Sequence, residues 1–340
     1  MANYRVKQYE EENLFEFCSP SETQNKQQVP LEPALSFLAD AMRRLKKNKG
    51  AVIGGWLIIA FIVIALLAPL LAPYNPTSQQ VAYSNLPPKI PGVSINGFNG
   101  FRAGVDQYAL AGVPSDTYYY LGTDGLGRDL LSRILYGTRL SLVIAFSAAL
   151  FDLTIGVIYG LISGWYGGKV DIVMQRILEM LSGIPNLVIL VLMLLFLQPG
   201  IGSIILALGF TGWITMARVV RAQTLKQKSA EYILAAKVLG QSFPQIAWKH
   251  LLPNISGVII IQTMFTIPSA IFFEAFLSFL GIGVPSPSAS LGSLINAGYK
   301  TFRFLPHLMW FPALVLCVLM ISFNLFADGL RDAFDPKQKD

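Results

Sequence analysis

Long apolar stretches recur along this chain of 340 residues and constrain its fold more than any other feature. A helix needs about 20 apolar residues to cross the hydrocarbon core of a bilayer. Hydrophobic residues make up 53% of the chain and charged residues 14%, whereas soluble domains carry about 25% charged residues. The sequence therefore predicts an all-α, polytopic membrane protein with six transmembrane helices. They cover about Ala51–Ala72, Leu142–Trp165, Ile177–Leu197, Ile204–Val219, Ile255–Ile282 and Pro306–Phe326.

Positive charge gives the predicted orientation, because the cytoplasmic flanks of transmembrane helices carry an excess of Lys and Arg. Basic residues crowd the stretch 43–49, the turn around Lys169, the loop 218–254 and the C-terminal end. Both termini are therefore predicted to be cytoplasmic, in a multi-pass protein of the cell membrane. The net charge of +6 is attributed to this anchoring, and no nucleic-acid partner is predicted.

These assignments divide the chain into five segments. The first is a cytoplasmic tail that includes an amphipathic helix lying on membrane lipid. The long segment after the first transmembrane helix is rich in Pro and Gly, cannot be one helix and is placed outside the cell. The segments are 1–50 (tail and interfacial helix), 51–72 (first transmembrane helix), 73–138 (extracellular segment), 139–330 (core with five transmembrane helices and the cytoplasmic loop 218–254) and 331–340 (cytoplasmic tail).

The loop 218–254 carries structure of its own, because it is the longest polar interruption in an apolar C-terminal half. Ser229 is predicted to cap a short helix that Gly240 stops. Pro244 is predicted to start a second helix that Pro253 ends. Along one side of the first helix, residues recur at helical spacing: Tyr232, Ala235, Ala236 and Leu239. The predicted helix-turn-helix projection, called the knob (residues 218–254), either lies on lipid headgroups or docks on another protein.

A glycine-rich stretch, Leu121 to Arg133, precedes the second predicted transmembrane helix. Its glycines and Asp124 predict a turn, with Asp129 near the start of an interfacial helix that bears Arg133 outward. These glycines lack the strand-turn-helix context and the spacing of a dinucleotide site. Gly168-Lys169 is not a P-loop either, because Val follows the Lys, so no nucleotide site of these kinds is predicted.

Three acidic residues fall in or beside the predicted transmembrane helices, where an ionised group is costly unless it faces a cavity or a partner. They are Asp152, Glu179 and Glu274. Either they line or gate a polar path, or they bond to neighbouring helices. Pro185 predicts a kink in the third transmembrane helix. His250 and His307 are predicted on opposite sides of the membrane, so no metal site is predicted.

Four motifs resemble those of one protein family. Glu231 to Ala236, with Gly240 and Leu252-Pro253, resembles the "EAA" loop of the membrane subunits of ATP-binding-cassette (ABC) importers. The other three resemble signatures of the second, C-type membrane subunit of oligopeptide and dipeptide permeases. They are Leu121–Asp129, Glu274–Val284 and Phe323–Pro336. The chain departs from the family pattern at Leu234, where many members carry Glu, and at Leu291, where Trp is common.

The resemblance implies a type I ABC importer permease fold and a pore for oligopeptides. It implies a second permease subunit as heterodimer partner, two ATP-binding subunits, a substrate-binding protein outside the membrane, and no catalysis in this chain. ATP and Mg would be bound by the partner subunits, so no cofactor is expected here. The residues implied in coupling to the ATPase are Glu231, Ala235, Ala236, Lys237, Gly240, Leu252 and Pro253. The residues placed at the outer contact with the binding protein are Asp124, Arg128, Asp129 and Arg133.

Three alternatives stay open. A self-contained channel or secondary transporter would show internal repeats and broken helices with paired mid-membrane charges, and no clear repeat is found. The same ABC scaffold could carry another solute, such as a metal chelate. A membrane-embedded enzyme would need a catalytic constellation, and no His-Glu-x-x-His or Gly-x-Ser-x-Gly pattern is present.

Overall fold

The computed structural model describes residues 37–198 and 200–334. The predictions for the N-terminal tail before residue 37, and for the tail beyond residue 334, lie outside these described residues. The described part is mainly helical, and only the segment between residues 72 and 129 is largely irregular. Its long helices are α2 (Phe37–Lys47), α3 (Lys49–Leu66), α6 (Leu130–Tyr166), α7 (Gly168–Ser182), α8 (Asn186–Phe196), α9 (Ile201–Lys228), α12 (Leu252–Phe279), α13 (Leu291–Lys300) and α14 (His307–Phe334).

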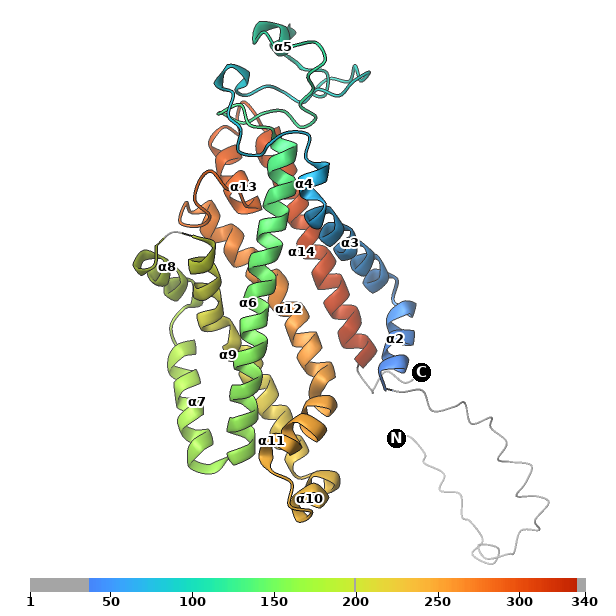
Figure 1. The fold of residues 1–340 in the computed structure, drawn as a ribbon, viewed down its shortest axis with the longest axis vertical. Helices are drawn as coiled ribbons and strands as arrows, with labels where there is room; N and C mark the ends of the chain where they lie inside the picture. Colours follow the sequence, from blue (N-terminus) through green and yellow to red (C-terminus); the bar gives the residue numbers. More distant parts are fainter. Residues whose placement is uncertain (1–36, 199, 335–340) are drawn as a thin grey trace, which may run out of the picture.

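Short elements connect the long helices. The turns of helix are α4 (Ala68–Leu71), η2 (Val81–Tyr83), α5 (Gln107–Leu110), α10 (Glu231–Val238), α11 (Phe243–Ile246) and the π-helical turn η3 (Ala247–Leu251). The strands β1 (Phe101–Arg102) and β2 (Val105–Asp106) pair antiparallel, with Phe101 opposite Asp106. In Figure 1, α10 lies at one extreme of the bundle and α5 lies at the opposite extreme. These two extremes are called the α10 end and the α5 end.

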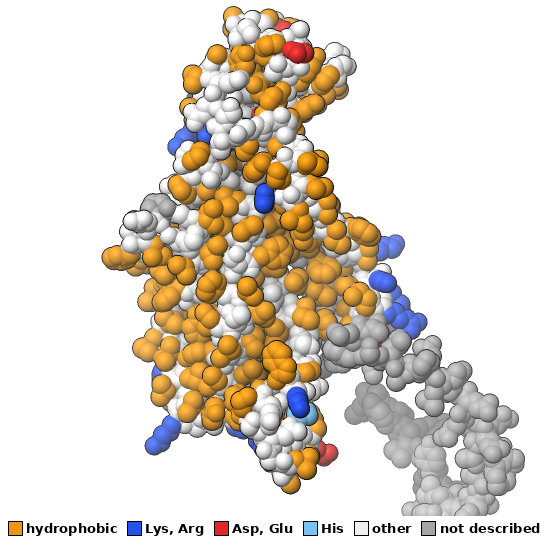
Figure 2. Space-filling view, viewed as in Figure 1, with side chains coloured by type: hydrophobic (Ala, Val, Ile, Leu, Met, Phe, Trp, Pro, Cys, Tyr) orange, Lys and Arg blue, Asp and Glu red, His pale blue; other side chains and the backbone are white. Residues whose placement is uncertain are grey.

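Five of the helices are long and apolar enough to cross a membrane: α3, α6, α9, the continuous run Phe243–Phe279, and α14. The pair α7 and α8 passes the same test as one bent span, with an angle of 81° between its halves. The structure thus has five spans, or six if the bent pair counts as one, where the hydropathy predicts six. The bend falls where Pro185 predicts a kink. Figure 2 shows a broad belt of hydrophobic side chains between the two ends. The chain is a multi-pass membrane protein.

Helix α6 is longer than predicted and runs through the centre of the bundle (Figure 1). It begins at Leu130 rather than about Leu142, because Asp129 caps it and no Pro or Gly-rich break separates the interfacial turn from the apolar part. Its 37 residues extend about 55 Å at 1.5 Å per residue. A bilayer core is about 30 Å thick, so the ends of α6 project beyond it.

Three glycines one turn apart let α6 pack closely on α9. A Cβ on Gly156 would lie 2.6 Å from Met216 Cβ, one on Gly160 2.6 Å from the Ala217 carbonyl oxygen, and one on Gly164 2.7 Å from Thr224 Cβ. Small residues at four-residue spacing are the usual basis of close helix contacts in membranes, because van der Waals packing replaces the hydrophobic effect there. These glycines therefore set the α6–α9 distance, and through it the position of the chain that follows α9.

The described N-terminal helices pack against the end of α14. Leu45 of α2, Ala51 of α3 and Ala333 of α14 form one small apolar cluster. Asn48 caps α3 by accepting a hydrogen bond from the Ala51 N–H, 3.2 Å between donor and acceptor. The amphipathic helix predicted before the first transmembrane helix is thus present as α2.

Candidate functional sites

The knob at the α10 end has its own small core. Ile233 and Ala236 of α10 are buried against Ile246, Ala247 and Leu251, which belong to the run α11–η3. Ala236 is therefore part of the core of the knob, whereas Ala235, Glu231 and Lys237 are exposed. The sequence periodicity placed Tyr232 and Leu239 on the same side as the two alanines. The structure instead buries the Ile233 side and exposes Tyr232 and Leu239.

Gly240 ends α10 as predicted. Its φ of +77° is left-handed, which favours glycine, and a Cβ would meet no atom within 4 Å. The Gly240 N–H donates to the Lys237 carbonyl at 3.0 Å, and the Gln241 N–H donates to the Ala236 carbonyl at 3.1 Å. This pair of bonds is the Schellman arrangement, which satisfies the last carbonyls of a helix.

Two predicted helix boundaries in the knob are wrong. Ser229 does not cap α10, because it follows Lys228 as the C-terminal cap of α9, and Ala230 precedes α10 without a side-chain cap. Pro253 does not end a helix, because the chain stays helical from Phe243 to Phe279. The π-helical turn Ala247–Leu251, closed by the Leu252 N–H on the Ala247 carbonyl, widens the helix just before the proline ring. Leu252 is half-buried and Pro253 is exposed.

Aromatic contacts tie the knob to the end of α6. The Lys237 ammonium lies 4.4 Å from the centroid of the Trp165 ring. Trp165 also stacks on Phe243, with ring centroids 5.1 Å apart. Beyond these contacts, the tip presents large apolar side chains to the surroundings: Val238 is 87% exposed, Leu239 79% and Trp248 76%. The knob is thus a braced projection with an uncovered apolar tip.

At the α5 end, the stretch Gly122–Asp129 forms the predicted turn. The Asp124 carboxylate accepts hydrogen bonds from the Leu126 N–H at 2.9 Å and the Arg128 N–H at 3.0 Å. It also accepts from Arg128 Nε at 2.7 Å. Asp129 caps α6 by accepting from the Ser132 N–H at 2.7 Å. Burial raises the pKa of the Asp129 carboxyl above its usual range.

The four charged residues of this stretch are buried within the subunit. Asp124, Arg128, Asp129 and Arg133 are each less than 10% exposed. Arg133 points inward, contrary to the outward direction predicted for it, because the chain between α4 and α5 folds over the start of α6. The Arg133 Nη1 donates to the Pro76 carbonyl at 3.2 Å and to the Pro287 carbonyl at 3.5 Å. The exposed parts of the turn are Gly125 and Leu126.

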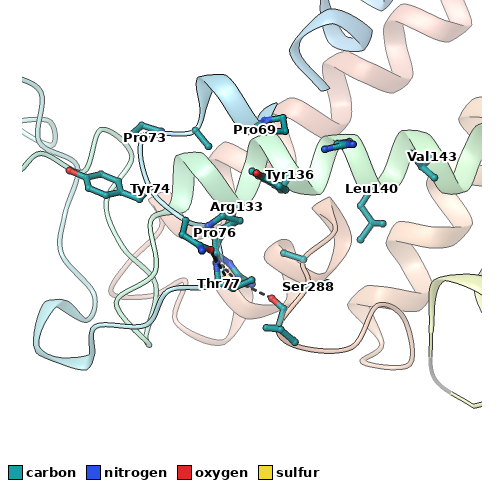
Figure 3. Close-up of a pocket in the computed structure, with 15 residues that line it drawn as sticks. Pro69, Pro73, Tyr74, Pro76, Thr77, Arg133, Tyr136, Leu140, Val143 and Ser288 are labelled. Atoms are coloured by element: carbon teal, nitrogen blue, oxygen red, sulfur yellow. Dashed lines mark hydrogen bonds between the residues drawn. The ribbon is translucent and has the colours of Figure 1, made fainter. Parts of the chain in front are cut away.

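Arg133 also forms the wall of a cavity of about 650 Å³ beside the start of α6. Figure 3 shows Arg133, Tyr136, Leu140 and Val143 along one helix, facing the chain that carries Pro76 and Thr77. The sequence predictions did not include this cavity. Its signal in the sequence is the pair Tyr136 and Arg139, polar residues next to the apolar part of α6.

The three intramembrane acids lie in different environments. The Glu274 carboxylate of α12 is fully buried and accepts hydrogen bonds from Ser141 and Ser278, both at 2.8 Å. Asp152 of α6 is buried against Gly212 of α9, where no side chain could fit, and its Oδ1 has no hydrogen-bond partner among the described residues. Glu179 of α7 is exposed and pairs with Arg176 at 2.8 Å.

That these three acids line or gate a polar path through the membrane stays a prediction. Glu274 links α12 to α6 inside the subunit, so its contacts are those of helix packing. The three acids are not brought together. Within residues 37–198 and 200–334, no group of three or more His, Cys, Asp or Glu side chains could hold a metal ion.

The similarity of this membrane-spanning bundle to known proteins identifies its class, a transport permease. The model of the binding-protein-dependent transport system inner membrane component matches residues 156–340. The model of the N-terminal transmembrane domain of oligopeptide transport permease C matches residues 36–88. The chain belongs to the family of binding-protein-dependent transport system inner membrane components, which are transport permeases rather than enzymes.

Similar curated proteins cover most of the chain. The dipeptide transport system permease protein DppC of Lactococcus lactis subsp. cremoris is 49% identical over 318 residues, which are 90% of this chain and 92% of that protein. The oligopeptide transport system permease protein OppC of Bacillus subtilis is 39% identical over 304 residues, with 89% and 91% covered. A solved structure of the MetNI methionine ABC transporter in an inward-facing conformation shares the fold. Its TM-score is 0.50 at 19% identity, with 60% of this chain and 97% of that chain covered.

Proposed function

We propose that this chain is one of two permease subunits that form the pore of an ABC importer for short peptides. The observation that carries the proposal is the knob, whose exposed Val238, Leu239 and Trp248 project from a braced base at the α10 end. An apolar tip of this kind costs free energy in water and fits a cleft in another protein. We assign that cleft to an ATP-binding subunit, with a second such subunit on the partner permease.

In this proposal the α10 end faces the cytoplasm. Basic residues support that orientation, since Arg218, Arg221, Lys226 and Lys228 lie on the last turns of α9, next to the knob. The α5 end then faces outward, where a substrate-binding protein would deliver its cargo. Asp124, Arg128, Asp129 and Arg133 are buried, so they would hold the turn in place without touching the binding protein. The exposed Gly125 and Leu126 would contact the binding protein.

Two connections would transmit a movement of the knob to the membrane-spanning helices. Lys237 and Phe243 contact Trp165 at the end of α6, and the helix Phe243–Phe279 continues from the knob across the membrane. A displacement of the knob by ATP binding in the partner subunit would therefore tilt α6 and α12 together. Further along, the Ser141 hydroxyl of α6 donates to the Glu274 carboxylate of α12, which couples these two helices.

Co-purification of the ATP-binding subunits tests the docking step. The exposed pair Val238→Ser and Leu239→Ser removes the apolar tip and leaves the buried core of the knob intact. We expect ATP-binding subunits that are co-expressed with this chain to co-purify with the wild type and to be lost from the double variant. Val81→Ser, a change of a 67% exposed valine far from the knob, is the control. Retention of the ATP-binding subunits by the double variant would refute docking through the tip.

The peptide cargo is proposed from the named activities of the relatives, since the dipeptide and oligopeptide permease proteins match this chain over most of its length. Uptake of a labelled dipeptide and of a labelled nickel chelate, measured side by side in vesicles that hold the complete transporter, tests it. We expect uptake of the dipeptide. Uptake of the chelate alone would reassign the cargo while leaving the permease class in place.

A further inference from the structure

The cavity beside the start of α6 has no role in the proposed import of peptides. Its volume is about 650 Å³. Three separate parts of the chain form its walls: residues 69–77, the part 133–143 of α6, and residues 287–289. Figure 3 shows Pro69, Tyr136 and Ser288, one labelled residue from each part. A ligand in this cavity would therefore contact the end of the first span, α6 and the loop before α13.

Arg139 is the accessible basic side chain in these walls. It is exposed, and it makes no hydrogen bond or ion pair among the residues that the structure describes. Arg133, the other arginine of the lining, is buried and already bonded, because its Nη1 donates to two backbone carbonyls and its Nε lies 3.5 Å from the Asp124 carboxylate. A charged side chain beside the apolar part of a bilayer is costly without a partner, so an anion at Arg139 would be favourable.

The other polar groups of the lining also suit an anion. No Asp or Glu of residues 37–198 and 200–334 belongs to the lining. The hydroxyls of Tyr136 and Ser288 and the amide nitrogen of Asn75 donate no hydrogen bond within the described chain. The carbonyl oxygen of the Asn75 side chain is already used by the N–H and the hydroxyl of Thr77. The groups left for a ligand can all donate, and the planar guanidinium fork matches the oxygens of a phosphate.

The cavity lies at the depth of lipid phosphates. The first predicted transmembrane stretch ends at Ala72 and the second begins at Leu142, and the lining includes Ala72, Leu140 and Val143. Arg139 precedes Leu142 by three residues of α6, or about 4.5 Å at 1.5 Å per residue. The headgroup layer on each side of the hydrocarbon core is about 5–8 Å thick, so Arg139 falls within that layer.

The wall toward the apolar part of the bundle suits an acyl chain. Val143 lies one turn after Arg139 on the same face of α6, since residues four apart share a helix face. Val143 is 49% exposed, and Pro69, across from α6 on α4, is exposed as well. The cavity therefore has a cation at its outer part and an open apolar wall at its membrane part, which is the pattern of a phospholipid.

We propose that this cavity binds an anionic phospholipid from the leaflet at the α5 end, with its phosphodiester on Arg139 and an acyl chain along Val143 and Pro69. One guanidinium matches the single negative charge of a phosphodiester. The lining offers no carboxylate to the ammonium group of a zwitterionic headgroup, so a headgroup without a cation is preferred. The bound lipid would contact α4 and α6 together and so stabilise the attachment of the first span to the bundle.

Native mass spectrometry of the delipidated full-length subunit, titrated with lipids of one kind at a time, tests the proposal. Phosphatidylglycerol is the anionic probe, and phosphatidylethanolamine adds an ammonium group to the same phosphodiester and acyl chains. We expect saturable binding of phosphatidylglycerol and binding of phosphatidylethanolamine that is several-fold weaker. Equal affinities for the two lipids would overturn the proposal. Displacement of phosphatidylglycerol by water-soluble glycerophosphoglycerol, which lacks acyl chains, would make the ligand a free phosphodiester and contradict the lipid assignment.

Variants of Arg139 locate the phosphate. Arg139→Gln keeps a good helix former at an exposed position, and we expect it to weaken phosphatidylglycerol binding about tenfold or more, because a charge-assisted hydrogen bond is lost. Arg139→Lys keeps the charge without the planar fork and should weaken binding about two- to fivefold. Arg303→Gln is the matched control, because Arg303 is also exposed and lies outside the lining. Wild-type affinity in Arg139→Gln, or an equal loss in Arg303→Gln, would overturn the proposal.

A variant that keeps every donor tests the cavity itself. Ala72→Phe places a ring in the lining, where Ala72 is half-buried, and should weaken phosphatidylglycerol binding as Arg139→Gln does. Wild-type affinity in Ala72→Phe would show that the lipid binds elsewhere.

The complete transporter gives the last comparison. We expect phosphatidylglycerol to co-purify with the wild-type complex and to be depleted from the complex that carries Arg139→Gln. Absence of the lipid from the wild-type complex would show that the second permease subunit covers the cavity, and would overturn the proposal. Because none of these measurements needs ATP or peptide, their failure would leave the proposed transport function standing.

Discussion

The ammonium group of Lys237 lies 4.4 Å from the centroid of the Trp165 ring, and this contact fastens α10 to the last turn of α6. A cation over an aromatic ring contributes about 0.5–1 kcal/mol at an exposed site. The ring of Phe243 stacks on the same Trp165 ring. Tyr166 of the same helix also contacts Phe243, with ring centroids 5.5 Å apart, and Leu161 belongs to the apolar cluster of the knob. The Lys237–Trp165 contact is therefore one of several contacts with α6 that position the knob.

Replacement of Lys237 is expected to loosen the knob. In Lys237→Gln the cation is lost, so limited proteolysis within residues 229–242 should become roughly two- to fivefold faster, which corresponds to about 0.5–1 kcal/mol. Lys237→Arg keeps a cation that can lie over the ring and should digest at the wild-type rate. Equal digestion rates in all three proteins would show that the contact contributes nothing.

Gly240→Ala is expected to destabilise the end of α10. The left-handed conformation at φ +77° costs a residue with a Cβ about 1–2 kcal/mol, although no atom stands in the way of the methyl group. Hydrogen exchange of the Gln241 amide, which bonds the Ala236 carbonyl, should become faster by roughly tenfold. Gly125→Ala is a matched control, because Gly125 is exposed and does not have a positive φ. If the Gln241 amide exchanged as slowly in Gly240→Ala as in the wild type, the role assigned to Gly240 would be contradicted.

Gly160→Val is expected to force α6 and α9 apart. Any Cβ at this position would lie 2.6 Å from the Ala217 carbonyl oxygen and 2.7 Å from Val220 Cβ, and both atoms belong to the packed face of α9. Overpacking of this kind typically costs about 1–3 kcal/mol, so the apparent Tm of the subunit in detergent should fall by several degrees. Gly202→Ala on α9, with no atom within 4 Å of the added Cβ, should leave the Tm unchanged.

Asp129 is expected to make stability depend on pH. Because burial raises the pKa of this carboxyl in the folded protein, the folded state holds the proton more tightly than the unfolded state. Its contribution is thus fully present below the unfolded pKa, about 3.9, and is lost as pH rises through the folded pKa. The neighbouring Tyr119 stays neutral throughout this window, since burial raises its pKa to about 12.

The comparison of two variants measures this effect. Asp129→Asn keeps the cap and should show a smaller fall in apparent Tm than the wild type between about pH 4 and pH 7. Asp129→Ala loses the helix cap as well as the charge. It should be less stable than Asp129→Asn at every pH, by about 1 kcal/mol. A wild-type pH profile parallel to that of Asp129→Asn would show that the carboxyl does not titrate differently in the folded state.

The sequence predicted the features that local physics decides. Apolar stretches located the five long spans and the bent pair, Pro185 located the bend between α7 and α8, and Gly240 located the end of α10. Asp124 was correctly placed in a turn, because its side chain bonds backbone groups two and four residues ahead. Each of these depends on residues close in sequence, for which residue type and spacing suffice.

Features decided by distant residues could not be predicted in this way. Arg133 is buried because Pro76 and Pro287, far from it in sequence, supply carbonyl oxygens at its position. Pro253 continues a helix only because a π-helical turn precedes it. A small cavity at the α5 end is likewise lined by Tyr74, Tyr83 and Tyr119, which come from three separate places in the chain.

ATP-driven uptake of a labelled short peptide tests the central claim most directly. The complete transporter in membrane vesicles, with wild-type chain or with Val238→Ser and Leu239→Ser together, should be compared with and without ATP inside the vesicle compartment that the knob faces. The account predicts uptake that requires ATP and is abolished in the double variant, although the subunit still inserts. Uptake that persists without ATP and in the double variant would contradict the account and identify a self-contained transporter.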